Sequence, residues 1–412
     1  MPVRCRLWSG LLLLMLAGSA WAGKKVELDY HIRLLPQSDQ AEVRLTLAQG
    51  SAVRSLDFAL GAQGYYTDFK ADGQWLTQPD QAGTGSRGIW RPAAGKASLS
   101  YRVSISHPRR NGTFDTRMTS HWALLRGEEL VPPAHLDQQD GAELVSRLEF
   151  ELPTGWKSVE TAWPRIGKNR FRIDNVSRLF DRPTGWILAG NLGSRRERLG
   201  ETEVTVAAAR GEGMRRMDVL TLLTFVWPKV QEVFPRNPPK LLVVGAGESM
   251  ARGARAAHDS IYVHSTGPLI GESGASPLVR ELVHVFGRIN DSHHSDWIGE
   301  GLAEYYAIEL VRRAGGISEE RYQALQARMA RISHAVTSLR GDQVSGPTVA
   351  RAVLLLQALD REIRQQTGDK HSLDDVSRAA MRLDTVTTQE FIQLSESVLG
   401  GPSKVLATDL LK

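Results

Sequence analysis

The first half of the chain is dominated by stretches in which hydrophobic and polar residues alternate. Between residues 26 and 34 every second residue is apolar, and the residues between them are charged or are histidine. The same period returns at 99–105, 148–152 and 204–206. Because the side chains of a strand point alternately to its two faces, this period predicts strands with one buried face. Many short strands separated by turn-forming stretches predict one β-sandwich-like domain over residues 23–210.

Helical spacing replaces this alternation near residue 211. Helices are expected at 215–233, 319–338, 349–366, 373–383 and 388–399, the first of them bent or broken at Pro228. Two short apolar runs, at 241–244 and 260–264, indicate buried strands. The pattern therefore predicts a second, mainly helical domain over residues 211–412 and an α+β fold for the whole chain.

Two more helices are expected between residues 276 and 316. Ser276 is a good N-cap residue, and Pro277 suits the first helical position. Apolar residues at helical spacing follow them. The second helix is expected to begin at residue 295 or 296 and to end at the glycine pair 315–316.

The first of these two helices carries Arg280-Glu-Leu-Val-His284, which departs by one residue from the H-E-x-x-H motif of zinc peptidases. In that motif two histidines one turn apart bind one metal ion, and the glutamate beside the first is the general base. Glu281 is therefore a candidate general base and His284 a candidate metal ligand. Glu300, on the second helix, is a candidate for a further ligand. Arg280 stands where the motif has its first histidine.

Residues 1–22 have the form of a secretory signal peptide. Two arginines precede an apolar run that is too short to span a bilayer, and the small-residue cleavage site Ala20-Trp21-Ala22 follows it. We therefore expect a periplasmic or secreted protein without a transmembrane segment after cleavage. The single cysteine, Cys5, lies within this signal, so cleavage leaves no thiol for disulfides, catalysis or metal binding.

Charge and motif spacing disfavour two other function classes. The formal net charge of +5 falls to +3 on loss of Arg4 and Arg6, and the basic residues are scattered among acidic ones. This pattern does not indicate a nucleic-acid partner. The stretch from Gly245 to Ser249 lacks the G-x-S-x-G spacing of a serine hydrolase.

The order of these parts resembles the gluzincin metallopeptidases, in particular the secreted glycyl-aminopeptidase-like branch, which often bears a PDZ domain. The most specific pieces are E-L-V-H at 281–284, W-I-G-E-G-L-A-E-Y-Y at 297–306 and L-D-R-E-I-R-Q-Q-T-G-D-K-H-S-L-D-D-V at 359–376. The resemblance covers most of the chain after residue 22. It implies an N-terminal β domain followed by a thermolysin-like, mainly helical catalytic-type domain with a helical tail, and zinc as the cofactor of the active relatives.

The chain departs from that family at three positions. Arg280 replaces a zinc ligand. The acidic residue that holds the substrate's free amine in the family corresponds to Arg255, and the tyrosine that stabilises the tetrahedral oxyanion corresponds to Val349, which has no donor. The three changes affect the metal, the substrate anchor and the oxyanion donor.

Arg280 changes the electrostatics that a metal ion would meet. A dication about 5 Å from its guanidinium would be repelled by roughly 6–7 kcal/mol at an effective dielectric constant of about 20. His284 and Glu300 alone should bind zinc poorly, since a catalytic zinc normally has three protein ligands. We therefore expect no cofactor, and we hypothesise that Arg280, near Glu281 and Glu300, takes over part of the metal's structural charge.

Three neighbouring residues leave alternatives open. His293 and His294 lie in the loop between the two helices; either could replace the missing zinc ligand, or both are solvated loop residues. Glu304, one turn after Glu300, is either a carboxylate that orients His284 or a surface charge that pairs with arginines.

These features favour an exported pseudopeptidase that keeps the cleft of a peptidase and uses it to bind a polypeptide or a partner protein. A first alternative is an active zinc metallopeptidase or aminopeptidase in which Glu281 is the base and His284, Glu300 and a loop histidine are the ligands. A second alternative is a structural envelope module whose cleft has no activity.

Overall fold

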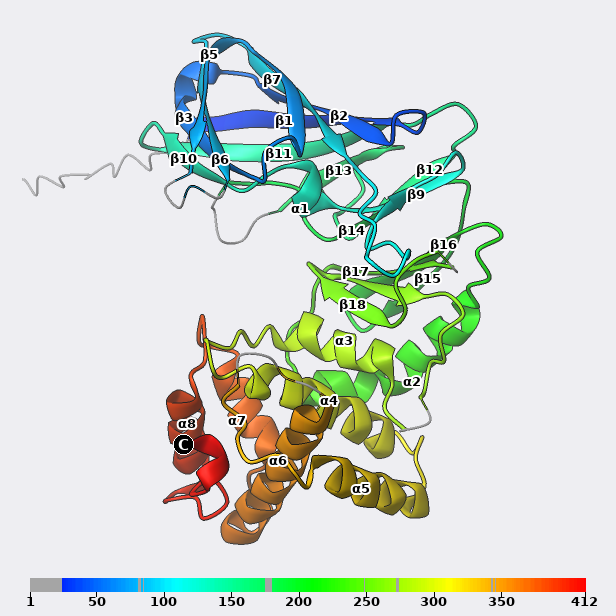
Figure 1. The fold of residues 1–412 in the computed structure, drawn as a ribbon, viewed down its shortest axis with the longest axis vertical. Coiled ribbons are helices and arrows are strands. Elements are labelled where there is room, and N and C mark those ends of the chain that lie inside the picture. The colour runs from blue at the N-terminus through cyan, green and yellow to red at the C-terminus, as the bar shows by residue number, and fades with distance from the viewer. Residues whose placement is uncertain are drawn as a thin grey trace, which may run out of the picture.

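The computed structural model describes residues 24–412 except 81, 82, 84, 175–179, 248, 272, 273, 342, 343 and 345. The expected signal peptide and its Cys5 lie outside the described residues. The structure is a mixed α/β fold in which strands fill most of the chain up to residue 264 and helices most of the chain after it. The N-terminal sheets lie at one end of the molecule and the helices at the other (Figure 1).

A six-stranded sheet forms the centre of the N-terminal part. Its longest strand, β1 (Lys24–Leu35), pairs antiparallel with β2 and parallel with β11. The alternation expected from the sequence is present, because the apolar residues at 26, 28, 30, 32 and 34 are at most 3% exposed. In spatial order the strands are β13 (Arg170–Ile173), β11 (Ala142–Glu151), β1, β2 (Gln40–Leu47), β7 (Ala97–Ser104) and β4 (Tyr66–Ala71).

Two four-stranded sheets pack with this sheet around one hydrophobic core. The first has the order β10 (Ala134–Gln138), β3 (Val53–Gly61), β6 (Ser86–Pro92) and β5 (Gly73–Pro79). The second has the order β12 (Ser158–Thr161), β14 (Trp186–Gly190), β9 (Trp122–Arg126) and β8 (Arg117–Met118). The short helices η1 (Gly50–Ala52) and α1 (Gly127–Leu130) join strands within this part.

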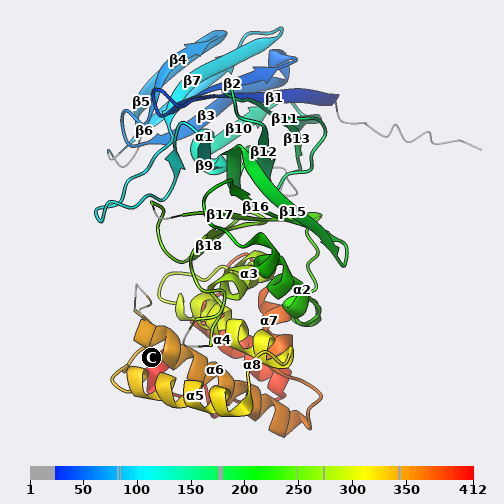
Figure 2. The same ribbon diagram turned by 90° about the vertical axis from the view of Figure 1, so that its right-hand side faces the viewer.

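A five-stranded sheet lies between the N-terminal sheets and the helices (Figure 2). Its order is β15 (Leu192–Leu199), β16 (Thr202–Ala209), β17 (Lys240–Ala246), β19 (Ser260–His264) and β18 (Ala254–Ala257). One face packs on β9 and β14 through a small core that includes Trp122, Trp186 and Tyr262. The sequence-based boundary at residue 210 falls between β16 and β17, which pair in parallel, so this sheet takes strands from both sides of it.

The helices share one large core with the other face of that sheet. They are α2 (Arg216–Val233), α3 (Pro277–Gly287), α4 (Trp297–Arg313), α5 (Glu319–Ser333), α6 (Gly346–Thr367), α7 (Leu373–Ala380), α8 (Thr388–Leu399) and the short η2 (Asp409–Leu411). The expected break at Pro228 does not occur, since α2 continues past it. The buried neighbours Val226, Trp227 and Val230 pack that turn into the core, which outweighs the lost backbone hydrogen bond.

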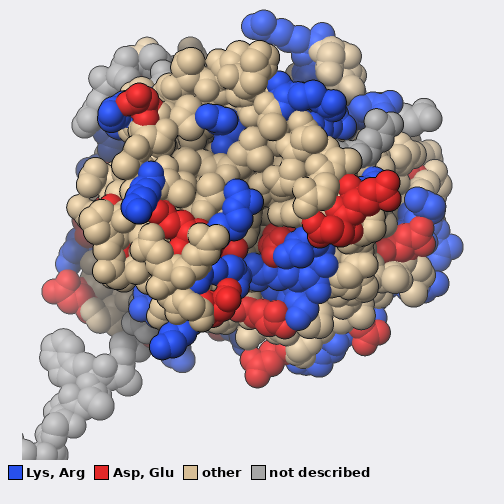
Figure 3. Space-filling model, turned by 90° about the horizontal axis from the view of Figure 1, so that it is seen from below, with Lys and Arg blue, Asp and Glu red and all other residues tan. Residues whose placement is uncertain are grey.

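Two surface properties bear on the possible partners. None of the described helices is both long and apolar enough to cross a lipid bilayer. On the face seen from below, Lys and Arg residues lie interspersed with Asp and Glu residues (Figure 3).

Candidate functional site

Helices α3 and α4 bring the motif residues together, and local sequence signals determine where each helix begins. Ser276 caps α3, because its Oγ accepts the backbone N–H of Val279 at 3.3 Å, and Pro277 is the first helical residue, as predicted. At the start of α4, Asp291 Oδ2 accepts the backbone N–H of Gly299 at 2.8 Å. Helix α3 packs against α4 and against β18 and β19 of the five-stranded sheet.

Arg280 lies between three carboxylates. Its Nη1 donates to Glu281 Oε1 at 3.0 Å, its Nη2 forms a close ion pair with Glu300 Oε2, and its Nε lies 3.4 Å from Glu304 Oε2. Because Glu300 and Glu304 belong to α4, the guanidinium joins the two helices by charge-assisted contacts. The Arg280 side chain is 28% exposed, so water screens these contacts only in part. We call these four residues the Arg280 cluster.

Glu281, the candidate general base, has both carboxylate oxygens engaged. Oε1 accepts from Arg280, and Oε2 accepts the backbone N–H of Ala256 in β18 at 2.7 Å. The Glu281 side chain is only 9% exposed. These two donors fix the orientation of the Glu281 carboxylate between α3 and the edge strand β18.

His284 lies beside the cluster. Its Nε2 is 3.8 Å from Glu300 Oε1. Burial lowers the pKa of His284, and the charge of Arg280 lowers it further, whereas Glu281 raises it. Burial also raises the pKa of Glu304, an effect that Arg280 opposes. Glu304 thus pairs with an arginine, as in one of its two expected roles.

The donor atoms in this region do not form the set that a catalytic zinc needs. Among the residues that the structure describes, no three His, Cys, Asp or Glu side chains are arranged to hold a metal ion. His293 and His294 are exposed and stack edge to face at 3.9 Å between ring centroids, and His294 Nδ1 is 3.2 Å from the Arg340 carbonyl oxygen. The loop histidines thus form no such group with His284 and Glu300.

A cavity of about 410 Å³ opens beside the Arg280 cluster. Arg280, Glu300 and Glu304 line one side of it, and the remaining lining consists mainly of apolar residues from α4, α5 and α6, with Arg328 among them. Val349, the position expected to carry the oxyanion tyrosine in active relatives, lines this cavity with a side chain that has no hydrogen-bond donor.

Arg255, the position matched to the amine-binding acid, lies on the edge strand β18. Its Nη1 is 3.8 Å from Asp115 Oδ1, and its carbonyl oxygen accepts from Trp186 Nε1 at 2.9 Å. No sequence signal links Asp115 or the Ala256 N–H to the motif, so these two contacts of the strand were not predicted.

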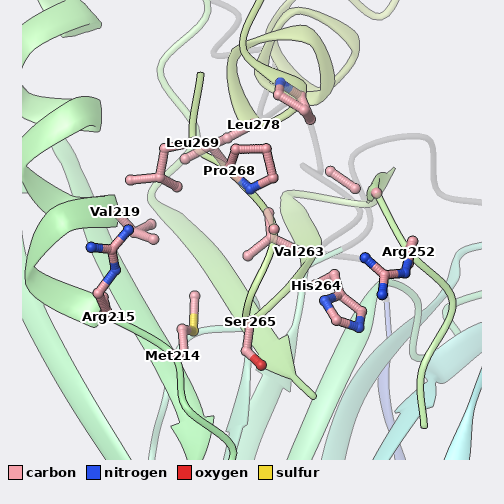
Figure 4. A pocket seen from close by; sticks show the side chains of 14 residues that line it. Met214, Arg215, Val219, Arg252, Val263, His264, Ser265, Pro268, Leu269 and Leu278 are labelled. Carbon is pink, nitrogen blue, oxygen red and sulfur yellow. The ribbon is translucent and has the colours of Figure 1, made fainter. Parts of the chain in front are cut away.

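A second pocket, of about 160 Å³, lies at the N-terminal end of α3. Its wall is mainly apolar, with Val219 from α2, Val263 from β19 and Leu278 from α3. Arg215 lies on one side of this pocket, and Arg252 and His264 lie on the other (Figure 4). The sequence pattern gave no functional expectation for these residues.

Comparison with known proteins gives a likeness of fold. No protein-family model and no curated protein matches the sequence. An aminopeptidase N family protein from Idiomarina loihiensis has a similar structure, with a TM-score of 0.68 and 14% identity over 89% of this chain and 72% of that chain.

Two further solved structures are similar. An M1 zinc metallopeptidase from Deinococcus radiodurans, in a mutant bound to a Tyr-Ser-Ala substrate, has a TM-score of 0.59 and 14% identity, over 94% of this chain and 93% of that chain. Legionella pneumophila aminopeptidase A, in complex with aspartic acid, has a TM-score of 0.60 and 14% identity over 94% of this chain and 49% of its own. This chain thus has the fold of M1 zinc metallopeptidases, which agrees with the gluzincin resemblance noted in the sequence.

Proposed function

We propose that this protein is a non-catalytic pseudopeptidase that binds a polypeptide or a partner protein in its cleft. It would be a glycyl-aminopeptidase-like chain with a degenerate zinc motif and a thermolysin-like helical domain, exported to the periplasm or secreted. The observation that carries the proposal is the Arg280 guanidinium, which contacts Glu281, Glu300 and Glu304 in the region where a zinc peptidase needs a metal ion.

The state of Glu281 supports a binding role over a hydrolytic one. A general base must be within hydrogen-bond reach of the proton that it takes, so its carboxylate has to face the substrate. Glu281 already accepts from Arg280 and from Ala256 N–H, and it is nearly buried. These contacts suit a structural carboxylate that joins α3 to the edge of the sheet.

The cavity beside the cluster supports binding of a polypeptide side chain. Its volume of about 410 Å³ lies within the range of ordinary ligand sites. One wall carries Glu300 and Glu304 beside Arg280, and the other walls are mainly apolar. A side chain with an apolar stem would bury that stem against the apolar walls. Its polar end would meet a balanced lining, Glu300 and Glu304 against Arg280 and Arg328.

The decisive experiment is the back-substitution Arg280→His with zinc titration and a peptide-hydrolysis screen. We expect the wild-type protein to contain less than stoichiometric zinc by elemental analysis after refolding with zinc, and to hydrolyse no peptide. In Arg280→His the repulsion is gone and a third ligand is present, so zinc affinity should rise by at least about tenfold. One zinc per wild-type chain, together with peptide turnover that Glu281→Gln abolishes, would refute the proposal.

A second candidate is an active zinc aminopeptidase with an altered ligand set. It is favoured by the fold, since the neighbours from Deinococcus radiodurans and Legionella pneumophila are described as a zinc metallopeptidase and an aminopeptidase. This candidate requires His293 or His294 to join His284 and Glu300. Wild-type zinc content that falls in the double variant His293→Ala and His294→Ala would favour it.

A pull-down separates cleft binding from a purely structural role in the cell envelope. The bait proteins are the wild type, Glu300→Ala and the surface control Arg195→Ala, each checked for an unchanged circular dichroism spectrum. Loss of specific partners from Glu300→Ala alone supports recognition in the cleft. Identical partners for all three baits count against it and favour the envelope module.

A further inference from the structure

A larger cleft, of about 890 Å³, lies between the N-terminal sheets and one end of the five-stranded sheet. Arg182 and Trp163 line it from the N-terminal side. Arg236, Asp259 and Arg288 line it from the other side, where α2 and α3 end and β18 turns into β19. We call it the arginine cleft after its three arginines. It lies outside the Arg280 cluster and shares no residue with the cavity beside that cluster.

Two of these arginines share a single carboxylate oxygen. Arg236 Nη2 donates to Asp259 Oδ1 at 2.5 Å, and Arg288 Nη2 donates to the same atom at 3.1 Å. Arg236 also donates to the Val285 carbonyl oxygen at 2.7 Å. One carboxylate balances one guanidinium, so this group retains a positive charge.

The third arginine is anchored to neutral acceptors. Arg182 Nη1 donates to the carbonyl oxygens of Glu128 and Val131, at 3.1 and 2.7 Å. Asp174, the other carboxylate that lines the cleft, already pairs with both Nε and Nη2 of Arg172. Asp259 is therefore the one lining carboxylate left to balance the three guanidiniums, and it is shared by Arg236 and Arg288. Burial lowers the pKa of Arg182 and of Arg288, as expected for cations that have lost part of their hydration.

The backbone and an aromatic stack hold this arrangement in place. Asp259 and Arg288, which pair with each other, both adopt a φ of +45°, in the left-handed region that non-glycine residues rarely occupy. Trp163 stacks on the His258 ring, with 4.7 Å between centroids and 19° between planes. Strained residues over-determined by their surroundings are typical of pre-organised binding sites.

From these contacts we propose that the arginine cleft binds an oxyanion, a carboxylate or phosphate group carried by a small molecule or a short peptide. The planar guanidinium fork matches both groups, and partly desolvated cations gain more from a bound anion than hydrated ones do. The volume exceeds that of a lone anion and lies in the range of small-molecule sites. The anion would sit between Arg288 and Arg182 and would link the N-terminal sheets to the five-stranded sheet.

Isothermal titration calorimetry of the full chain at constant ionic strength tests this assignment. The probes are inorganic phosphate, N-acetyl-triglycine and the C-terminal amide of the same tripeptide, each against a chloride reference. We expect saturable binding of phosphate, of the tripeptide acid or of both, and none of the amide. Phosphate alone would identify a phosphorylated ligand, and the tripeptide acid alone a carboxylate. No saturable binding of either anion overturns the proposal.

Variants locate the binding. Arg288→Gln removes one fork and should weaken binding about tenfold or more, whereas Arg195→Gln, the same charge change on the exposed strand β15, should leave it within twofold. Arg288→Lys keeps the charge but loses the fork, so it should bind more weakly than wild type and serves if Arg288→Gln does not fold. Equal affinities in wild type and Arg288→Lys or Arg288→Gln would place the anion elsewhere and refute the site.

Discussion

The Arg280 cluster and the arginine cleft have opposite charge balances although both involve helix α3. The cluster sets one guanidinium against Glu281, Glu300 and Glu304, whereas the cleft sets three guanidiniums against Asp259. Arg280 and Arg288 are eight residues apart, about 12 Å along a helix axis. Near the middle of α3 the cluster has an excess of negative charge, contributed by Glu300 and Glu304 of α4. Arg288, which directly follows the C-terminal end of α3, belongs to the positively charged cleft, and the helix dipole favours a cation there.

The two groups also differ in how their central residue is held. In the cluster, the cation is contacted by carboxylates on two helices, and its contacts hold those helices together. In the cleft, two cations share one oxygen atom of Asp259 and still face an open volume. Replacing Arg280 in the cluster and Asp259 in the cleft should therefore affect the stability of the protein differently.

The largest effect is expected for Arg280→Met, which leaves three carboxylates together without their cation. The free energy of unfolding, measured by urea denaturation at pH 7, should fall by about 2–4 kcal/mol. This loss is smaller than the one expected for a fully buried ion pair, because the Arg280 side chain is 28% exposed. Arg195→Met, an exposed control, should change it by less than about 0.5 kcal/mol. A loss no larger than that of the control would show that Arg280 does not hold α3 and α4 together.

Asp259→Asn should have the next largest effect. It leaves Arg236 and Arg288 without their counter-charge, and asparagine tolerates the positive φ of this position, so the backbone need not change. We expect a loss of about 1–3 kcal/mol in urea denaturation. Added phosphate should restore part of that loss in Asp259→Asn but not in Arg280→Met. The control is Asp140→Asn, because the Asp140 side chain is fully exposed. If phosphate raised the free energy of unfolding of all three variants equally, a specific anion site would be contradicted.

The smallest effect concerns pH. Burial lowers the pKa of His258 from its ordinary 6.5, with Arg288 and Arg236 adding to the effect and Asp259 opposing it. As the pH falls through 6.5, His258 is therefore protonated in the unfolded chain before it is protonated in the folded one. Acidification thus lowers the free energy of unfolding from its value at pH 7. Between pH 7 and pH 5 the wild type should lose more unfolding free energy than His258→Gln, by under about 1 kcal/mol. An equal loss in both proteins would show that His258 does not cause this pH dependence.

Local signals explain which parts of the fold followed from the sequence. Alternation predicted β1, and Ser276 with Pro277 predicted the first residue of α3, because burial of one strand face and capping depend on residues close in sequence. The continuity of α2 through Pro228 did not follow, since tertiary packing of its buried face decides it. The pairing of β16 with β17 did not follow either, because strand partners far apart in sequence leave no local signal.

In the candidate site, too, contacts within one helix could be predicted from the sequence, whereas contacts between distant segments could not. Helical spacing placed Arg280 and His284 one turn apart on one helix, and Glu300 and Glu304 one turn apart on the next. The proximity of Glu300 to the first pair was expected from the zinc-peptidase motif, not from spacing. The contact from Glu281 to Ala256 joins segments 25 residues apart and depends on how α3 lies against the sheet. The three arginines of the arginine cleft come from three distant segments, so only the folded chain reveals it.

The contact between Glu281 and Ala256 also affects the exposed edge of the five-stranded sheet. Strand β18 is the last strand of that sheet, and such edges invite pairing with another extended chain. Here a helix carboxylate occupies the N–H that a guest strand would use at Ala256. The Glu281 side chain therefore disfavours pairing of another strand with β18. An added strand could hydrogen-bond to the Ala256 N–H only by displacing Glu281.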